Sequence, residues 1–214
     1  MTEDRTILEK MMLRTIIFDL GGVYFSDGTR VAIDTISVKY RIERDSVETI
    51  LNGKPGKQYR IGKISVEQFW HQANTSWNIE ISSEKLSQIW YSSYQPNEGV
   101  VRLVARLKNA GYELLYLSNN TRERVAYLDK KYSFRQKFND GIFWHVVKCK
   151  KSDSLIYQLL LNRASHPASE CVYIDDKPEY LGPAKSLGMQ VIAFKSASQL
   201  ESRLKELLLL PDAS

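Results

Sequence analysis

Cysteine is scarce in this chain, and long apolar runs are missing. The 214 residues contain two cysteines, Cys149 and Cys171, so we expect free thiols and a cytoplasmic protein instead of a disulfide framework. No apolar stretch approaches the roughly 20 residues needed to cross a bilayer, which argues against a membrane protein. Residues 1–10 mix acids and bases and form no apolar signal core, so secretion is not expected.

A concentrated basic surface is also missing, although basic residues outnumber acidic ones by 30 to 25. The net charge of +5 and the pI near 9.1 would suit nucleic-acid binding, but most basic side chains are interleaved with acids. The densest cluster is Lys148, Lys150 and Lys151. A site for an anionic small molecule explains this distribution better, so we do not expect nucleic acid as a partner.

The chain does contain a regular alternation of strand-like and helix-like segments. Short apolar or aromatic runs bounded by glycine or polar residues indicate strands that are buried on both faces. These runs lie at residues 15–19, 113–118, 141–145, 171–175 and 190–194. Amphipathic segments between them have helical periodicity. The alternation predicts an α/β fold built on a parallel sheet.

Residues 29–95, between the first and second predicted strands, break this alternation. They show helical periodicity and no convincing strand. We therefore expect a small helical subdomain at 29–95, inserted into a core formed by 1–28 and 96–214. In an open α/β sheet it would lie over the carboxyl edge, where ligands bind. Aromatic side chains at helical positions favour a role in the core of this segment, and they are Trp70, Trp77 and Trp90.

Polar side chains follow three of the predicted strands. Asp19 ends the first and enters a glycine turn, which lets the backbone approach a ligand closely. Ser118-Asn119 and Asp175-Asp176 end two later strands. Because the carboxyl ends of parallel strands meet at one edge, these groups should lie together, near a lysine of the 148–151 cluster. Three carboxylates and an amine there suggest a Mg²⁺ and phosphate site.

These segments resemble, in order, the four motifs of the haloacid dehalogenase superfamily. They are Phe18-Asp19-Leu20-Gly21-Gly22-Val23, Leu117-Ser118-Asn119, Lys151 and Ile174-Asp175-Asp176. The likeness spans about residues 15–194. Residues 59–65 and 183–189 are similar to the branch that contains the N-terminal phosphatase domain of soluble epoxide hydrolase and bacterial sugar-phosphate phosphatases.

The resemblance implies a Rossmann-like core, a helical cap after the first motif, and a Mg²⁺-dependent hydrolase of small, sugar-phosphate-type phosphomonoesters. Asp19 would attack phosphorus and form an aspartyl-phosphate, which water then hydrolyses. Mg²⁺ would be held by Asp19, by the Gly21 carbonyl and by Asp176, with Asp175 close behind.

The resemblance also implies how the phosphoryl group is bound. Ser118 and Asn119 would donate hydrogen bonds to it, and Lys151 would neutralise its charge and orient the nucleophile. Lys150 and Lys148 are the alternatives to Lys151, because the proline that usually follows this lysine is Ser152 here. The cap would exclude water and select the substrate.

The chain departs from the usual phosphatase motif at residue 21. A second aspartate there normally protonates the leaving oxygen and then activates water, but Gly21 has no side chain. General acid–base help is worth about 10²–10⁴-fold, so poor leaving groups should react slowly and an activated one, such as an anomeric phosphate, should suffer least. Tyr180 stands where an asparagine commonly follows the paired acids.

Two other functions are compatible with this motif set. The first is a phosphate-binding or partner-binding relative that kept the site but has weak or no turnover, because Gly21 replaces the acid–base group. The second is a 2-haloacid dehalogenase, in which Asp19 attacks carbon and no acid is needed at residue 21. Asp175-Asp176 argues against the second, because paired metal-binding acids serve phosphate chemistry.

Overall fold

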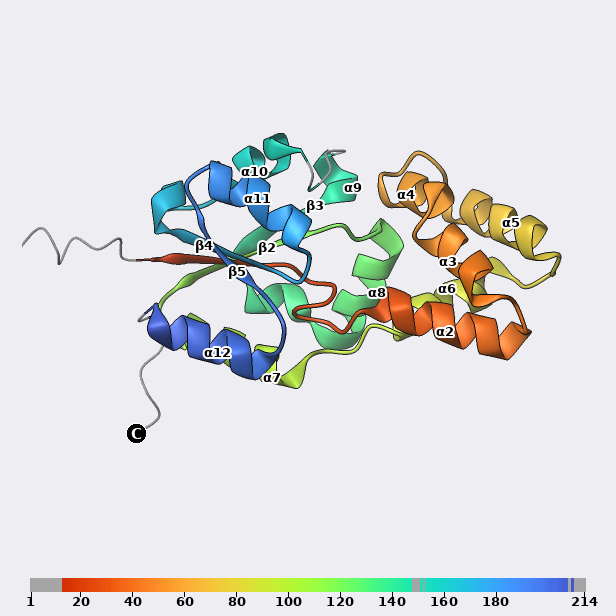
Figure 1. The fold of residues 1–214 in the computed structure, drawn as a ribbon, viewed down its shortest axis with the longest axis horizontal. Coiled ribbons are helices and arrows are strands. Elements are labelled where there is room, and N and C mark those ends of the chain that lie inside the picture. Colours follow the sequence, from red (N-terminus) through yellow and green to blue (C-terminus); the bar gives the residue numbers. More distant parts are fainter. Residues whose placement is uncertain (1–12, 148–150, 152, 208, 210–214) are drawn as a thin grey trace, which may run out of the picture.

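The computed structural model describes residues 13–147, 151, 153–207 and 209. Within these residues the chain forms a five-stranded sheet covered by helices (Figure 1). The strands are β1 (Thr15–Phe18), β2 (Glu113–Ser118), β3 (Asp140–Phe143), β4 (Cys171–Asp175) and β5 (Gln190–Ala193). The helices are α2 (Gly28–Tyr40), α3 (Arg44–Leu51), α4 (Lys54–Arg60), α5 (Val66–Trp77), α6 (Ser83–Ser92), α7 (Glu98–Asn109), α8 (Arg122–Tyr132), α9 (Trp144–Val147), α10 (Ser154–Leu161), α11 (Pro178–Ser186) and α12 (Ala197–Glu206), with 3₁₀ helices η1 (Phe134–Lys137) and η2 (Ala168–Glu170).

The sheet is parallel throughout, with the strand order β3-β2-β1-β4-β5, which confirms the expected α/β fold. β1 lies at the centre, and its register pairs Phe18 with Tyr116 on one side and with Ile174 on the other. The carboxyl ends of β1, β2 and β4 are therefore neighbours. Side chains that follow these strands emerge at one edge of the sheet, as parallel packing requires.

The strand predictions hold best in the middle of the sheet. The runs at 113–118 and 171–175 coincide with β2 and β4, whereas β1 and β5 each end one residue earlier than expected. The prediction of strand at 144–145 is wrong, because α9 begins at Trp144. β3 is an edge strand with a neighbour on one side only, so fewer ladder hydrogen bonds oppose this change to helix.

Helices cover both faces of the sheet because successive strand side chains point in opposite directions. Ile16 and Phe18 of β1 pack in one cluster with apolar residues of α7, α8 and α12. Ile17 packs in the other cluster with residues of α10 and α11. Figure 1 shows these two helical layers above and below the strands. Apolar packing on both faces holds β1 in place and fixes the position of the polar groups at its end.

The segment at residues 29–95 is formed by α2 to α6 and contains no strand, as predicted. Figure 1 places these helices beyond the carboxyl ends of the strands, beside α8. Their core is aromatic: Phe69 and the three tryptophans Trp70, Trp77 and Trp90 are all buried, which agrees with the core role expected for the tryptophans. The ring N–H groups of these three tryptophans donate hydrogen bonds to Ser87, Ser46 and Thr29 respectively, so none of the three indole donors is unpaired.

The two connections between the sheet and the inserted helices are hydrogen-bonded to each other. The Ser26 N–H donates to the Gln95 carbonyl at 2.8 Å, and the Gln95 N–H donates to Ser26 Oγ at 3.1 Å. The two connections therefore leave the sheet side by side, and a change in one is passed directly to the other.

Among the described helices, none has the length and apolar character needed to span a bilayer.

Candidate functional site

Asp19 lies directly after β1, with its side chain 8% exposed. Its N–H donates to the Ile174 carbonyl at 2.8 Å, so the backbone still follows the sheet at this point. The chain then turns through Gly22, which has φ +99°. A Cβ on Gly22 would lie 2.5–2.9 Å from the Asp176 carboxylate, so glycine is needed there for backbone conformation and for space.

Lys151 joins the ends of β1 and β4. Its Nζ lies 2.5 Å from Asp19 Oδ1 and 2.8 Å from Asp175 Oδ2, and the side chain is almost completely buried. The same Nζ lies 5.3 Å from the centre of the Tyr180 ring. Tyr180 stands where the motif that the sequence resembles commonly has asparagine. It contacts the lysine through its aromatic face. Lys148, Lys150 and Ser152 lie outside the described residues.

Asp175 and Asp176 have different environments although they are adjacent. Asp175 accepts hydrogen bonds at Oδ2 from Lys151 and from the Tyr173 hydroxyl, and at Oδ1 from the Lys177 N–H at 2.9 Å. Asp176 Oδ1 is buried and has no hydrogen-bond partner among the described residues. Both carboxylate oxygens of Asp175 therefore accept hydrogen bonds, and one of them holds Lys151, whereas Asp176 Oδ1 has no donor among the described residues.

One oxygen from each of Asp19, Asp175 and Asp176 lies within 4.8 Å of the others. Burial raises the pKa of Asp19 to about 7, partly offset by Lys151. Burial and the charge of Asp175 raise the pKa of Asp176 to about 6. Burial opposes the charge on Lys151, but Asp175 and Asp19 raise the pKa of its amine above the usual range. The cluster thus has more negative than positive groups and is suited to a hard cation.

Ser118 and Asn119 lie at the end of β2, on the side of Asp19 away from β4. Ser118 Oγ is buried and accepts a hydrogen bond from Asn120 Nδ2 at 3.3 Å. Asn119 Oδ1 is buried without a hydrogen-bond partner in the described part of the chain. The site therefore brings together the sequence-predicted groups that follow β1, β2 and β4. Two of these groups, Asn119 and Asp176, have a buried side-chain oxygen without a hydrogen-bond donor among the described residues.

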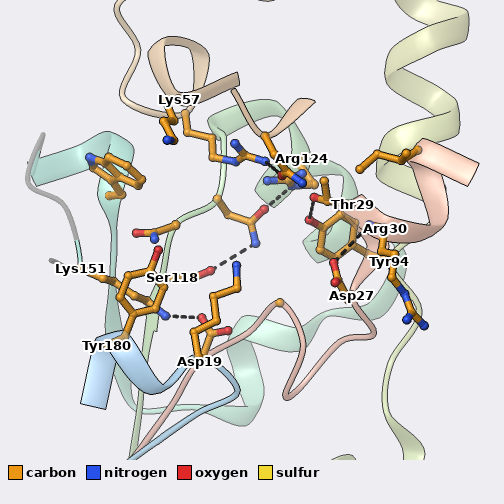
Figure 2. Close-up of a pocket in the computed structure, with 18 of the residues that line it drawn as sticks. Asp19, Asp27, Thr29, Arg30, Lys57, Tyr94, Ser118, Arg124, Lys151 and Tyr180 are labelled. Atoms are coloured by element: carbon orange, nitrogen blue, oxygen red, sulfur yellow. Dashed lines mark hydrogen bonds and ion pairs between the residues drawn. The ribbon is translucent and has the colours of Figure 1, made fainter. Parts of the chain in front are cut away.

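Asp19, Ser118, Asn119 and Lys151 border a cavity of about 630 Å³ between the sheet edge and the inserted helices (Figure 2). Gly21 also lines it, and a Cβ there would lie 3.4 Å from a ring carbon of Tyr94. The Tyr94 hydroxyl is 2.7 Å from Thr29 Oγ1 and is thus tied to α2. The inserted helices supply Arg30, Ile33, Arg44, Glu48, Asn52, Lys57 and Arg60 to the cavity wall.

Sequence reasoning missed the pair formed by Asn120 and Arg124. Arg124 Nε donates to Asn120 Oδ1, and Arg124 is 1% exposed at the cavity wall. Residues four apart lie on one face at the start of a helix, so the pair itself could have been anticipated from their spacing. Its burial could not, because the aromatic rings that cover Arg124 come from α6 and the segment after it.

The fold is that of an α/β protein whose parallel sheet carries a buried strand-end carboxylate, an acidic pair and a lysine at one edge, and comparison with known proteins gives its family. A model for haloacid dehalogenase-like hydrolases matches residues 13–188. The chain belongs to this family of enzymes.

Individual relatives and solved structures agree with this assignment. A sesquiterpene phosphatase from Aspergillus oryzae is 24% identical over 180 residues, which are 82% of this chain and 87% of that protein. A HAD-like family hydrolase from Porphyromonas gingivalis is 18% identical with a TM-score of 0.73, covering 94% of this chain and 100% of the other. A HAD family enzyme from Bacteroides thetaiotaomicron, solved with magnesium and inorganic phosphate, is 18% identical with a TM-score of 0.70, covering 86% of this chain and 95% of the other.

Proposed function

We infer that this hydrolase is a Mg²⁺-dependent phosphatase of small phosphomonoesters. The observation that carries this proposal is the convergence of Asp19, Ser118 and Lys151 on one cavity at the carboxyl edge of the sheet, with the Asp176 carboxylate clustered beside Asp19. The magnesium and phosphate complex of a protein with the same fold supports it, and so does the phosphatase among the sequence relatives.

The residues at the acidic cluster fit a magnesium ion. Asp176 Oδ1 is a buried oxygen with no partner in the described chain, and the carboxylate oxygens converge to within 4.8 Å. Asp19, Asp176 and the Gly21 carbonyl would hold the ion, and Asp175 would act indirectly by fixing Lys151. When bound, the ion would neutralise phosphate charge and polarise the phosphoryl group.

The chain's own groups would carry out the transfer. Lys151 holds one Asp19 oxygen, so the carboxylate is oriented before substrate arrives. Asp19 attacks phosphorus, the bond to the leaving oxygen breaks, and an aspartyl-phosphate forms. Ser118 and the Asn119 side chain hold the phosphoryl oxygens during this step. Water then attacks phosphorus, which releases phosphate and restores the carboxylate.

The proton for the leaving oxygen cannot come from residue 21. Gly21 has no side chain, and the Tyr94 ring borders the space that one would enter. We therefore propose that the enzyme favours leaving groups that depart without a proton from this position, such as p-nitrophenolate or an anomeric oxygen.

The inserted helices would form the cap expected at residues 29–95. They contribute most of the charged side chains on the far wall of the cavity, including Arg30, Lys57 and Arg60. A wall of this kind selects the substrate and limits the access of water to the aspartyl-phosphate.

Hydrolysis of p-nitrophenyl phosphate tests the proposal. We expect the wild type to hydrolyse it with Mg²⁺ and to lose activity with EDTA, and we expect Asp19→Asn to be at least about 10³-fold slower, because the nucleophile is gone. Equal rates for the two proteins would refute the role of Asp19. Phosphate binding without turnover would favour the inactive relative, and halide release from 2-chloropropionate would favour the dehalogenase.

A further inference from the structure

A second group of cations lines the end of the cavity away from Asp19. Arg124 on α8 and Arg60 at the end of α4 both border this region, together with Lys57. Figure 2 shows Arg124 and Lys57 across the cavity from Asp19 and Lys151. The proposed phosphoryl transfer assigns no task to these side chains.

Arg124 is a buried cation that packs against aromatic rings. Its guanidinium carbon lies 4.7 Å from the Trp90 ring centre and 4.6 Å from that of Tyr94. Its Nη1 is buried and has no hydrogen-bond partner in the described residues. No carboxylate of the described chain lies within ion-pair distance of Arg124. A buried charge without a counter-ion is costly, so an anion arriving at this point would relieve an existing penalty.

Arg60 brings a second positive charge to the same region. It is half-buried, and its guanidinium carbon lies 5.4 Å from the Trp90 ring centre that Arg124 also contacts. Burial and the neighbouring charge of Arg124 lower the pKa of Arg60 to about 10. The two guanidiniums therefore repel each other in the free protein. An anion between them would remove this repulsion and accept charge-assisted hydrogen bonds.

Asn120 separates this region from the phosphoryl site. Its Nδ2 donates to Ser118 Oγ at 3.3 Å, while its Oδ1 accepts from Arg124. One amide group thus lies between Ser118, which we expect to hold the reacting phosphoryl, and Arg124. Because this amide lies between them, Arg124 lies farther along the cavity than Ser118. It would therefore face a part of the substrate other than the reacting phosphoryl group.

We propose that Arg124 and Arg60 bind a second anionic group, a phosphoryl or a carboxylate, on the same small molecule whose phosphomonoester reacts at Asp19. The part of this inference that concerns the phosphomonoester reacting at Asp19 rests on the proposed phosphatase function. The cavity of about 630 Å³ has room for a small molecule that extends from one cluster to the other. The substrate class is therefore a phosphomonoester that carries a second negative group at its distal end.

Substrate pairs that differ only at the distal group test this inference in the Mg²⁺-loaded enzyme. Fructose 1,6-bisphosphate is compared with fructose 6-phosphate, and 3-phosphoglycerate with glycerol 3-phosphate. We expect the doubly anionic member to have the higher kcat/KM, through a lower KM. The preferred pair identifies the second group as phosphoryl or carboxylate.

Variants assign the preference to the arginines. We expect Arg124→Gln and Arg60→Gln each to lower the ratio of kcat/KM between the paired substrates by about tenfold or more, since each removes a charge-assisted contact. Arg124→Lys should keep part of the ratio. Arg122→Gln is the matched control, because Arg122 is an exposed arginine on the same helix, and it should keep the wild-type ratio. Thermal unfolding of each variant shows whether it is folded.

The outcomes separate this inference from the phosphatase proposal. Turnover of all substrates without a preference for the doubly anionic members would overturn the second anion site and leave the phosphatase intact. An equal loss on both members of each pair in Arg124→Gln would also overturn it, because Arg124 would then act only through Asn120 and Ser118. If no substrate is turned over, calorimetric titration with 3-phosphonopropionate decides. Binding that weakens in Arg124→Gln but not in Arg122→Gln would support the site without the phosphatase, and absence of binding would overturn both.

Discussion

The behaviour of Asp19 depends on how few cations surround it. Lys151 forms ion pairs with both Asp19 and Asp175, so two of the three carboxylates of the described cluster share one amine. Asp176 has no comparable partner, and its unpaired Oδ1 adds a free acceptor. The carboxylates therefore outnumber the amine that neutralises them, and protons or a divalent cation would compete to balance the remaining negative charge.

This competition predicts that stabilisation by Mg²⁺ depends on pH. The folded-state pKa of Asp19 is about 7 against an ordinary value of 3.8, and that of Asp176 is about 6. A carboxyl group with a raised pKa stabilises the fold below its ordinary pKa, and this contribution is lost as pH rises through the folded value. Mg²⁺ replaces the lost protons, so the increase in Tm on adding Mg²⁺ should be larger at about pH 8 than at about pH 5.5.

The Tm of the wild type with and without Mg²⁺, measured across this pH range, checks the prediction. Asp176→Asn is the informative variant, because it removes one ligand and one titrating group together. A Mg²⁺-induced increase in Tm that is the same at both pH values, or unchanged in Asp176→Asn, would contradict the assignment of these carboxylates to the ion.

Gly21 offers a second test at the residue scale. An added Cβ would be in ordinary contact with Tyr94, at 3.4 Å, so an aspartate can enter the cavity at this position. We expect Gly21→Asp to raise kcat for unactivated alkyl phosphates by about 10²-fold or more, and to help p-nitrophenyl phosphate much less. Gly21→Asn has the same size but cannot transfer a proton. A similar gain in Gly21→Asn would show that the effect is steric, and no gain in either variant would show that proton transfer does not limit turnover.

At the scale of elements, the site depends on how α2 is joined to the end of α6. Gly28 begins α2 and is buried against the ring of Tyr94, which is itself hydrogen-bonded to Thr29. The backbone hydrogen bonds between Ser26 and Gln95 close the same junction from the other side. These contacts at the junction therefore fix the position of the cavity wall that lies opposite Asp19.

Two helical glycines predict effects of different size on stability. A Cβ on Gly28 would lie 2.2–2.6 Å from the Tyr94 ring, so Gly28→Ala should destabilise the protein by about 1–3 kcal/mol through overpacking. A Cβ on Gly182, within α11, would meet nothing within 4 Å beyond its chain neighbours, but Pro183 follows it and opposes the gain in helix propensity, so Gly182→Ala should change stability by less than about 1 kcal/mol. Urea denaturation of the two variants measures both values. Destabilisation of similar size in both would contradict the packing at the junction.

Prediction from the sequence succeeds where local pattern and burial coincide. β2 and β4 are central strands, and their apolar runs mark their ends to the residue. Residues 144–145 are also apolar or aromatic in part, yet they belong to α9, because an edge strand is held by one neighbour only. Local sequence thus predicts an element well when the sheet confines it on both sides and poorly at an edge.

At the scale of the whole molecule, the same contrast applies to the site. Asp19, Ser118 and Asp175 could be placed together from sequence, because parallel strands deliver their carboxyl ends to one edge. The environment of Arg124 could not, because Trp90 and Tyr94 reach it only after the inserted helices pack against α8. The residues that we propose for phosphoryl transfer thus follow strand ends, whereas the proposed second anion site depends on packing between distant segments.

The central claim is that Asp19 is a nucleophile, and trapping the phosphoenzyme tests it most directly. The Mg²⁺-loaded wild type is mixed with ³²P-labelled acetyl phosphate, quenched in acid within the first turnovers, and digested for peptide mapping. We predict label on the peptide that contains Asp19, released by hydroxylamine as an acyl-phosphate, and no label in Asp19→Asn. Substrate consumption without label on Asp19, or equal labelling of Asp19→Asn, would contradict the account.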